Sequence, residues 1–179
     1  MKYVMIFVAG FVSSFSMAQT TPALKADTAD VSSIDNIVSA YYDVTNGPAG
    51  QRDWARYRSL FRPEAQLNAR VFNRSGRLQF IGGTLEEYIA QVDEYFTING
   101  FFETEIGRTV HHYNDIAQVF TAYDARLATN QASYHRGMKS LQLVYDDGRW
   151  WIVNVLYNNE PKLKPIPNEF LFEKYHSEQ

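Results

Sequence analysis

Two adjacent histidines, His111 and His112, are well suited to acid–base chemistry near neutral pH. Adjacent residues in a strand point to opposite faces of a sheet, so both histidines cannot serve one site without a bulge. One of them can therefore enter a pocket and act as a base, and His111 is the best candidate for a catalytic residue. The alternative is that the inward histidine is a hydrogen-bonded polar residue of the core. Because no ligand cluster lies beside them, no metal site is expected.

Glu103 and Glu105 are two residues apart in the preceding expected strand and share one face of it. Paired carboxylates can raise the pKa of one member enough for general-acid catalysis. The alternative is that both lie on a solvated face, because antiparallel sheets commonly expose one side to water.

Arg126 and Arg136 flank the segment between two expected strands. A guanidinium group suits bidentate capture of a carboxylate or phosphate ligand. The alternative is an internal ion pair with an acidic residue such as Glu103, Asp124 or Glu160, since buried arginines are usually paired.

Polar residues interrupt the apolar strands, and aromatic residues mark the helices expected to cover them. Such a combination suits a pocket for a flat, apolar ligand, although aromatic residues at helical spacing usually just pack. We expect His111, Arg136 and Gln142 to line one cavity beneath the helical aromatic residues. The full set of predicted ligand-binding residues is Tyr41, Trp54, Tyr57, His111, Arg126, Arg136, Gln142 and Asn154.

The elements that must position these side chains follow from periodicity and capping. Helices are predicted over residues 32–46, 53–61 and 84–98, because apolar residues recur there at helical spacing behind Ser, Asp or Thr caps. Apolar runs between polar turns then predict strands at 66–72, 78–81, 101–106, 117–123, 139–145 and 151–157. Helices followed by a long meander indicate an α+β fold, with a cone-shaped, strongly curved antiparallel sheet wrapped around three N-terminal helices.

Composition excludes several classes of function. The chain of 179 residues has a net charge of −3 and no basic stripe, so nucleic acid is not an expected partner. It has no cysteine, which rules out thiolate zinc sites and cysteine catalysis. Glycine-rich phosphate loops and nucleophile elbows are also missing from the sequence, and no cofactor is expected.

The first 18 residues have the pattern of a secretory signal peptide. Lys2 precedes an apolar run that ends in Ser16-Met17-Ala18, a small-x-small cleavage site. The run is too short to span a bilayer comfortably, so no stable membrane anchor is expected. We therefore expect cleavage after Ala18 and a periplasmic or secreted protein. The predicted organisation continues with a flexible leader at 19–30, one domain at 31–160 and an apolar tail at 161–179 that packs on the domain.

Several short motifs, together with the order of elements, resemble a known superfamily. They are residues 47–54, 60–61 and 114–120, Tyr123, Arg136-Gly137, residues 140–143 and 148–153, and Glu160-Pro161. In these the chain resembles the nuclear-transport-factor-2-like superfamily of ketosteroid isomerases and SnoaL-like polyketide cyclases, and within it a group of secreted bacterial SnoaL-like proteins of unknown function. The resemblance implies the cystatin-like or ketosteroid-isomerase-like cone and a homodimer formed through the sheet face.

The resemblance leaves the activity open, because this fold hosts many functions. Three hypotheses follow. The chain binds a small apolar or amphipathic molecule in the cone; or it is an isomerase, dehydratase or cyclase that uses a pocket histidine or carboxylate; or it is a structural or partner-binding homodimer.

Overall fold

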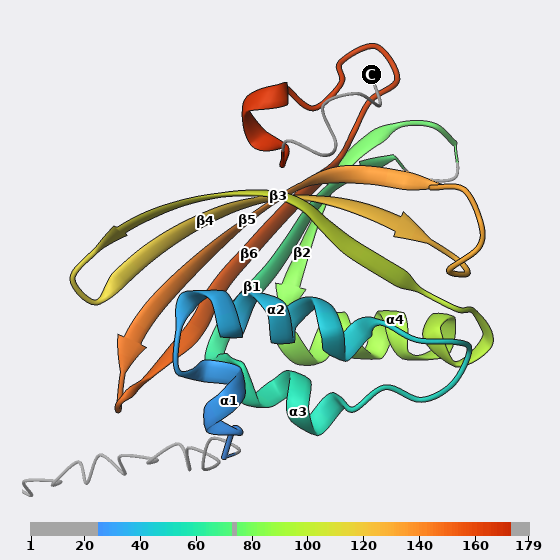
Figure 1. Cartoon of the computed structure of the whole chain (residues 1–179). Helices are drawn as coiled ribbons and strands as arrows, with labels where there is room; N and C mark the ends of the chain where they lie inside the picture. Colours follow the sequence, from blue (N-terminus) through green and yellow to red (C-terminus); the bar gives the residue numbers. More distant parts are fainter. Residues whose placement is uncertain (1–24, 73–74, 173–179) are drawn as a thin grey trace, which may run out of the picture.

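The computed structural model describes residues 25–72 and 75–172, so the expected signal peptide and the first part of the leader lie outside the described residues. The helices are α1 (Thr28–Val31), α2 (Ile34–Thr45), α3 (Trp54–Ser59) and α4 (Leu85–Ile98), with a short 3-10 turn, η1 (Asn168–Phe170). The strands are β1 (Phe61–Phe72), β2 (Leu78–Thr84), β3 (Phe102–Tyr113), β4 (Ile116–Arg126), β5 (His135–Asp146) and β6 (Arg149–Asn159). The predicted α+β class with a curved sheet against N-terminal helices is confirmed (Figure 1).

The six strands form one sheet in the order β2-β1-β6-β5-β4-β3. Strands β3 to β6 form the expected antiparallel meander, and β2 pairs antiparallel with β1. The sheet is mixed, however, because β1 runs parallel to β6, with Leu67 opposite Val155. The sequence predicted only antiparallel pairing, since nothing local to either strand encodes a pairing between segments almost ninety residues apart.

Each of the three predicted helices is present, with ends that differ by at most two residues. Thr84 and Glu87 form the expected capping box at the start of α4, and Asp53 caps α3 by accepting a hydrogen bond from the Arg56 backbone at 2.9 Å. Helix α2 begins one residue later than its predicted cap, because Ser33 rather than Ser32 accepts the bond from the Asn36 backbone.

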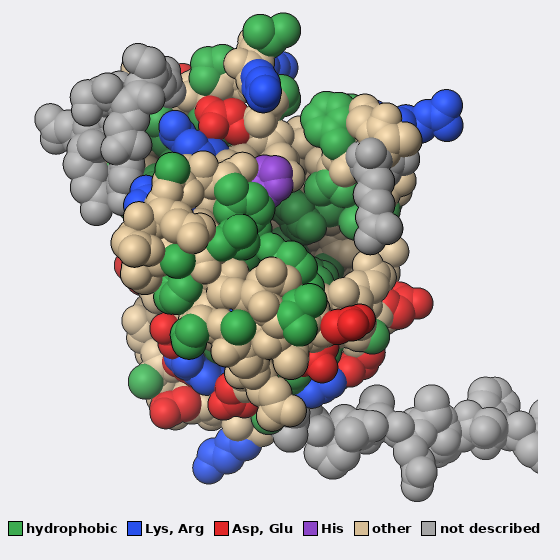
Figure 2. Space-filling model, turned by 90° about the vertical axis from the view of Figure 1, so that its right-hand side faces the viewer, with side chains coloured by type: hydrophobic (Ala, Val, Ile, Leu, Met, Phe, Trp, Pro, Cys, Tyr) green, Lys and Arg blue, Asp and Glu red, His purple; other side chains and the backbone are tan. Residues whose placement is uncertain are grey.

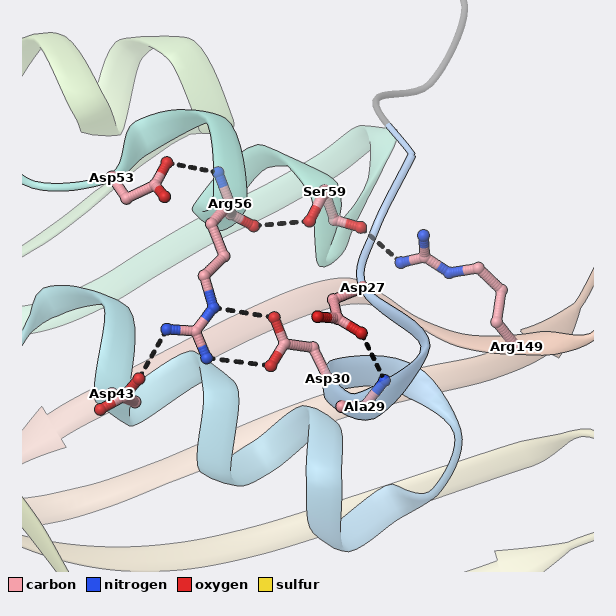
Figure 3. Close-up of polar contacts among 8 residues, drawn as sticks. All are labelled: Asp27, Ala29, Asp30, Asp43, Asp53, Arg56, Ser59 and Arg149. Atoms are coloured by element: carbon pink, nitrogen blue, oxygen red, sulfur yellow. Dashed lines mark hydrogen bonds and ion pairs between the residues drawn. The ribbon is translucent and has the colours of Figure 1, made fainter.

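Helix α1 overlaps the last three residues of the segment 19–30, the expected flexible leader. Asp27 caps it, and its Asp30 binds Arg56 of α3 through two bonds, Nε to Oδ2 at 2.8 Å and Nη2 to Oδ1 at 2.9 Å (Figure 3). The same guanidinium donates to Asp43 of α2 at 2.6 Å. Arg56 therefore joins three helices, and this pairing explains why the start of the domain is ordered.

The helices cover one face of the sheet and the C-terminal segment lies on the other (Figure 1). On the helical face, Val119, Leu141 and Val155 are almost completely buried against α2 and its neighbours. On the opposite face, Ile166 and Leu171 of the C-terminal segment pack against Ile106 of β3.

The contact between the C-terminal segment and β3 requires a glycine. A Cβ atom at Gly107 would lie 1.8 Å from the Phe170 carbonyl oxygen, so a larger residue would displace the segment. Gly107 sits at a bulge in β3, and the neighbouring Ile106 carbonyl accepts a hydrogen bond from the Phe172 backbone at 2.8 Å. This apolar cover explains part of why the sheet carries hydrophobic residues on both faces.

Candidate functional site

The concave face of the sheet and the helices enclose a cavity of about 200 Å³. The space-filling view shows a hollow that is edged by hydrophobic side chains (Figure 2). Helices α2 and α4 provide one wall, and strands β3 to β6 provide the other. The lining residues are Tyr41, Thr45, Val71, Tyr88, Val92, Tyr95, Phe96, Phe101, Glu103, Tyr123, Ala125, Tyr134, His135, Lys139, Tyr157 and Asn159.

Six of the lining residues are tyrosines, which gives the cavity aromatic walls with hydroxyl groups. Burial first, and then the nearby Glu103 carboxylate, raise the pKa of Tyr41 and of Tyr123 above the usual range. Burial also raises the pKa of Tyr88 and Tyr157. These phenols therefore stay neutral at physiological pH, and they can donate hydrogen bonds without adding charge to the cavity.

An ion pair between Glu103 of β3 and Lys139 of β5 lies in the wall of the cavity. The two side chains are only 5% and 7% exposed. The Lys139 amine also lies over three aromatic rings, 4.9 Å from the centroid of Tyr41, 4.5 Å from Tyr42 and 4.8 Å from Tyr123. Ammonium groups are stabilised at such distances by the negative faces of aromatic rings.

The position of Glu103 is fixed through its backbone by Asn46, at the end of α2. The Glu103 amide donates to Asn46 Oδ1 at 2.7 Å, and Asn46 Nδ2 donates to the Glu103 carbonyl at 2.9 Å. This reciprocal pair of bonds holds β3 against the helix end. The Glu103 carboxylate is therefore presented to the cavity by a rigid part of the chain.

Glu103 and Glu105 share a face, as predicted, but that face is not solvated. Glu105 is half-buried and accepts hydrogen bonds from Arg108 at 2.6 and 2.7 Å and from Thr121 at 2.6 Å. Each carboxylate is therefore paired with its own cation, Lys139 or Arg108. This face of the strand lies toward the helices rather than toward solvent, so the alternative of a solvated face is wrong for these two residues.

Of the three helical aromatic residues predicted to roof a pocket, Tyr41 lines the cavity. Tyr57 is completely buried behind it, with ring centroids 5.9 Å apart, and within the described residues its hydroxyl has no partner at good hydrogen-bond geometry. Trp54 packs on Tyr57, and its indole nitrogen donates to Asp93 at 2.5 Å. Trp54 and Tyr57 therefore support the wall of the cavity without reaching it.

His111, Gln142 and Asn154 lie away from this cavity. Val119, Leu141 and Val155 occupy inward positions of the central strands, so the alternation of side chains places Gln118, Gln142 and Asn154 on the outer face. His111 lies opposite Gln118 and shares that outer face. His111 and Gln142 line a shallow groove of about 490 Å³ on the sheet. Asn154 accepts a hydrogen bond from Asn68 at 3.0 Å.

Arg126 and Arg136 each form an ion pair with an acidic residue near a strand end, which is the alternative that the sequence offered for both. Arg126 binds Asp124 at 2.8 Å, and Arg136 Nε lies 3.5 Å from Glu160. Arg136 lines a different depression, together with Glu160 and the start of the C-terminal segment. The expected single cavity containing His111, Arg136 and Gln142 is therefore not what the structure shows, and a ligand-binding role for each of them stays a prediction.

Sequence reasoning missed the ion pair and most of the tyrosines. Lys139 was recognisable, because it shares a strand face with Leu141 and Leu143, and a lysine on an apolar face needs a partner. Its partner could not be found in the same way, since Glu103 is brought close only by the bending of the sheet. His135, at the start of β5, also lines the cavity, and burial lowers its pKa.

Within residues 25–72 and 75–172, no group of three or more His, Asp or Glu side chains is placed to hold a metal ion. No helix in that part of the chain is long and apolar enough to cross a membrane.

Solved structures share this architecture at low sequence identity. A protein of unknown function with a cystatin-like fold from Nostoc punctiforme PCC 73102 is 11% identical with a TM-score of 0.56, over 72% of this chain and 90% of that chain. A nuclear-transport-factor-2-like protein of unknown function from Pseudomonas putida KT2440 is also 11% identical with a TM-score of 0.56, over 72% of this chain and 84% of that one. The chain has the nuclear-transport-factor-2-like fold.

A domain of unknown function with a cystatin-like fold, also from Nostoc punctiforme PCC 73102, agrees with this assignment at 17% identity and a TM-score of 0.55, over 76% of this chain and 81% of that one. No protein-family model matches the sequence, and no curated protein matches it. At such identities the nuclear-transport-factor-2-like fold is established, while activity has to be argued from the cavity.

Proposed function

We propose that the chain binds a small, flat, uncharged molecule of apolar or amphipathic character in the cone cavity. The observation that carries this proposal is the lining, in which six tyrosines and two phenylalanines surround one internally neutralised ion pair. Aromatic walls with a few fixed polar groups are typical of small-molecule sites. A charged ligand would lose its hydration without gaining an unpaired counter-charge, so the cavity favours neutral ligands.

Three benzyl compounds of matched shape test this proposal: benzyl alcohol, benzoate and benzylamine. We expect benzyl alcohol to shift the backbone amide resonances of cavity residues such as Ala125 and Lys139 in a saturable way, and the two charged compounds to do so more weakly. Native mass spectrometry of the purified protein tests for a co-purified ligand. The proposal fails if the cavity resonances do not shift with benzyl alcohol and no ligand co-purifies.

A matched pair of variants at Val92 provides the control. Val92 is a half-buried α4 residue that lines the cavity, so its size can be changed without rebuilding the core. Val92→Phe should fill the space and weaken binding, whereas Val92→Ala should leave binding intact. Equal affinities for the two variants would place the ligand elsewhere.

An enzyme of the isomerase, dehydratase or cyclase type is the second candidate, favoured by the Glu103 carboxylate in the cavity wall. A carboxylate in a water-poor site can abstract a proton next to a carbonyl group. Solvent deuterium exchange into the methyl group of acetophenone, faster with the wild type than with Glu103→Gln, would support it; equal rates would remove it.

A homodimer through the outer sheet face is the third candidate. Four amide residues and a histidine lie in register across five strands of that face: His111, Gln118, Gln142, Asn154 and Gln66. Amide groups both donate and accept hydrogen bonds, so such a row can pair with a second copy of itself about a twofold axis. Gln142→Lys would bring like charges together there and should yield a monomer by light scattering; a monomeric wild type would exclude the dimer.

A further inference from the structure

The Lys139 amine is chemically distinctive among the lysines that the structure describes. Lys25, Lys162 and Lys164 are exposed, whereas Lys139 is buried and lines the cavity. A primary amine in an apolar pocket is a nucleophile toward carbonyl carbon once it has lost a proton. Glu103, which forms the ion pair with this amine, is placed to accept that proton.

The surroundings of Lys139 suit the product of such a reaction as well as the free amine. Condensation of an ammonium group with an aldehyde or ketone gives a protonated imine, which carries the same positive charge on the same nitrogen. The rings of Tyr41, Tyr42 and Tyr123 and the Glu103 carboxylate would therefore stabilise the iminium as they stabilise the ammonium. No new charge appears in the cavity, so the condensation carries no additional desolvation cost.

We propose that Lys139 forms a covalent imine with a small aldehyde or ketone bound in the cavity, and that Glu103 carries the proton. This inference rests on the proposed function and narrows its ligand to carbonyl compounds. Glu103 takes one proton from the ammonium, and the free amine forms a C–N bond to the carbonyl carbon while the C=O π bond breaks toward oxygen. A second N–H proton passes to that oxygen, which gives the neutral carbinolamine. The protonated Glu103 then returns the proton to the carbinolamine hydroxyl, which leaves as water. The net change is the exchange of carbonyl oxygen for nitrogen with release of one water.

Reductive trapping tests the proposal in the unmodified protein. The full chain is treated with benzaldehyde and sodium cyanoborohydride, which reduces an imine to a stable benzylamine, and modified lysines are located by peptide mass mapping. We expect Lys139 to be labelled at least about tenfold faster than the exposed lysines, because the cavity holds the carbonyl beside the amine. The exposed lysines serve as internal references, so no variant has to fold for this comparison.

Two variants test the separate roles of Lys139 as the nucleophile and Glu103 as the proton carrier. Lys139→Arg keeps the positive charge but cannot form an imine, so the fast labelling should vanish while the exposed lysines react as before. Glu103→Gln keeps the shape but cannot accept a proton, and should slow Lys139 labelling by about tenfold or more. Circular dichroism establishes that each variant is folded.

Benzyl alcohol separates the two proposals, because it fits the same space and has no carbonyl group. If benzyl alcohol binds in the cavity but Lys139 is labelled no faster than Lys162 and Lys164, the imine proposal is overturned and the binding proposal survives. If neither compound reaches the cavity, both are overturned.

Discussion

Lys139 on β5 reaches Glu103 on β3 across the intervening strand β4. Strands two places apart in a flat sheet are separated by about 10 Å, so the pair depends on the curvature that brings the concave faces of β3 and β5 together. The sheet therefore creates the cavity and, by the same bend, the ion pair in its wall.

Removing one member of this ion pair should destabilise the protein more than removing both. Lys139→Met or Glu103→Leu alone would leave a buried charge without its partner, at a cost of about 3–5 kcal/mol. The double variant should recover most of this loss or exceed the wild type, because two buried charges are replaced by apolar groups. Urea unfolding of the four proteins measures the difference, and additive losses would contradict a direct interaction.

The hydroxyl groups of Tyr123 and Tyr57 should respond in opposite ways to removal. Tyr123 donates to Asn159 at 2.6 Å, so Tyr123→Phe leaves that acceptor unpaired and should lower the free energy of unfolding by about 1–3 kcal/mol. Within the described structure the buried Tyr57 hydroxyl has no partner at good hydrogen-bond geometry, and only the hydroxyls of Tyr41 and Tyr88 lie near it, so Tyr57→Phe should be close to neutral or stabilising. Thermal unfolding of both variants checks this, and a large loss for Tyr57→Phe would reveal a hydrogen bond there.

Truncation of either tryptophan in β6 should be costly. Trp150 packs in the main core beside Tyr145, while Trp151 lies on the opposite face with Arg149 over its ring at 3.6 Å. Both are buried, so Trp150→Ala and Trp151→Ala should each lose about 3–5 kcal/mol of stability. An unchanged denaturation midpoint in both would mean that β6 is not a covered central strand.

The free energy of unfolding should decrease as the pH rises above about 10. Burial raises the pKa of Tyr41, Tyr42, Tyr57 and Tyr88 in the folded state, whereas tyrosines in the unfolded chain ionise near pH 10. Above about pH 10 the folded state therefore holds more protons than the unfolded state, and stability decreases as pH rises. Denaturant titrations between pH 8 and about pH 11 measure the slope, which should be shallower in Tyr88→Phe; an equal slope would exclude Tyr88 as a contributor.

Export is testable directly. We propose a periplasmic or secreted protein whose mature chain begins at Gln19, because Ser16-Met17-Ala18 fits a cleavage site. Intact-mass measurement of protein recovered outside the cytoplasm should give a chain without residues 1–18. A soluble chain that retains Met1 would contradict this.

Local sequence signals were sufficient to predict the helices and strands, but they were insufficient to predict which residues line the cavity. Thr84 and Glu87 predict the start of α4 because both partners lie within one turn. By contrast, the sequence predicts His111 and Gln142 inside the cone, although both face outward. The central strand β6 is apolar on both sides, so the sequence pattern does not say which side of the sheet the helices cover. The C-terminal segment around Leu171, which covers part of the outer face, is the long-range contact that resolves this ambiguity.

The parallel pairing of β1 with β6 also constrains the order in which the sheet can fold during synthesis. During synthesis β1 emerges early and must wait for the last strand, because Leu67 has no sheet neighbour on that side until Val155 is made. Contacts between such distant segments form late and slow the search for the native state. The cavity wall contains Tyr157 and Asn159 from that same last strand, so binding competence arises only when the chain is almost finished.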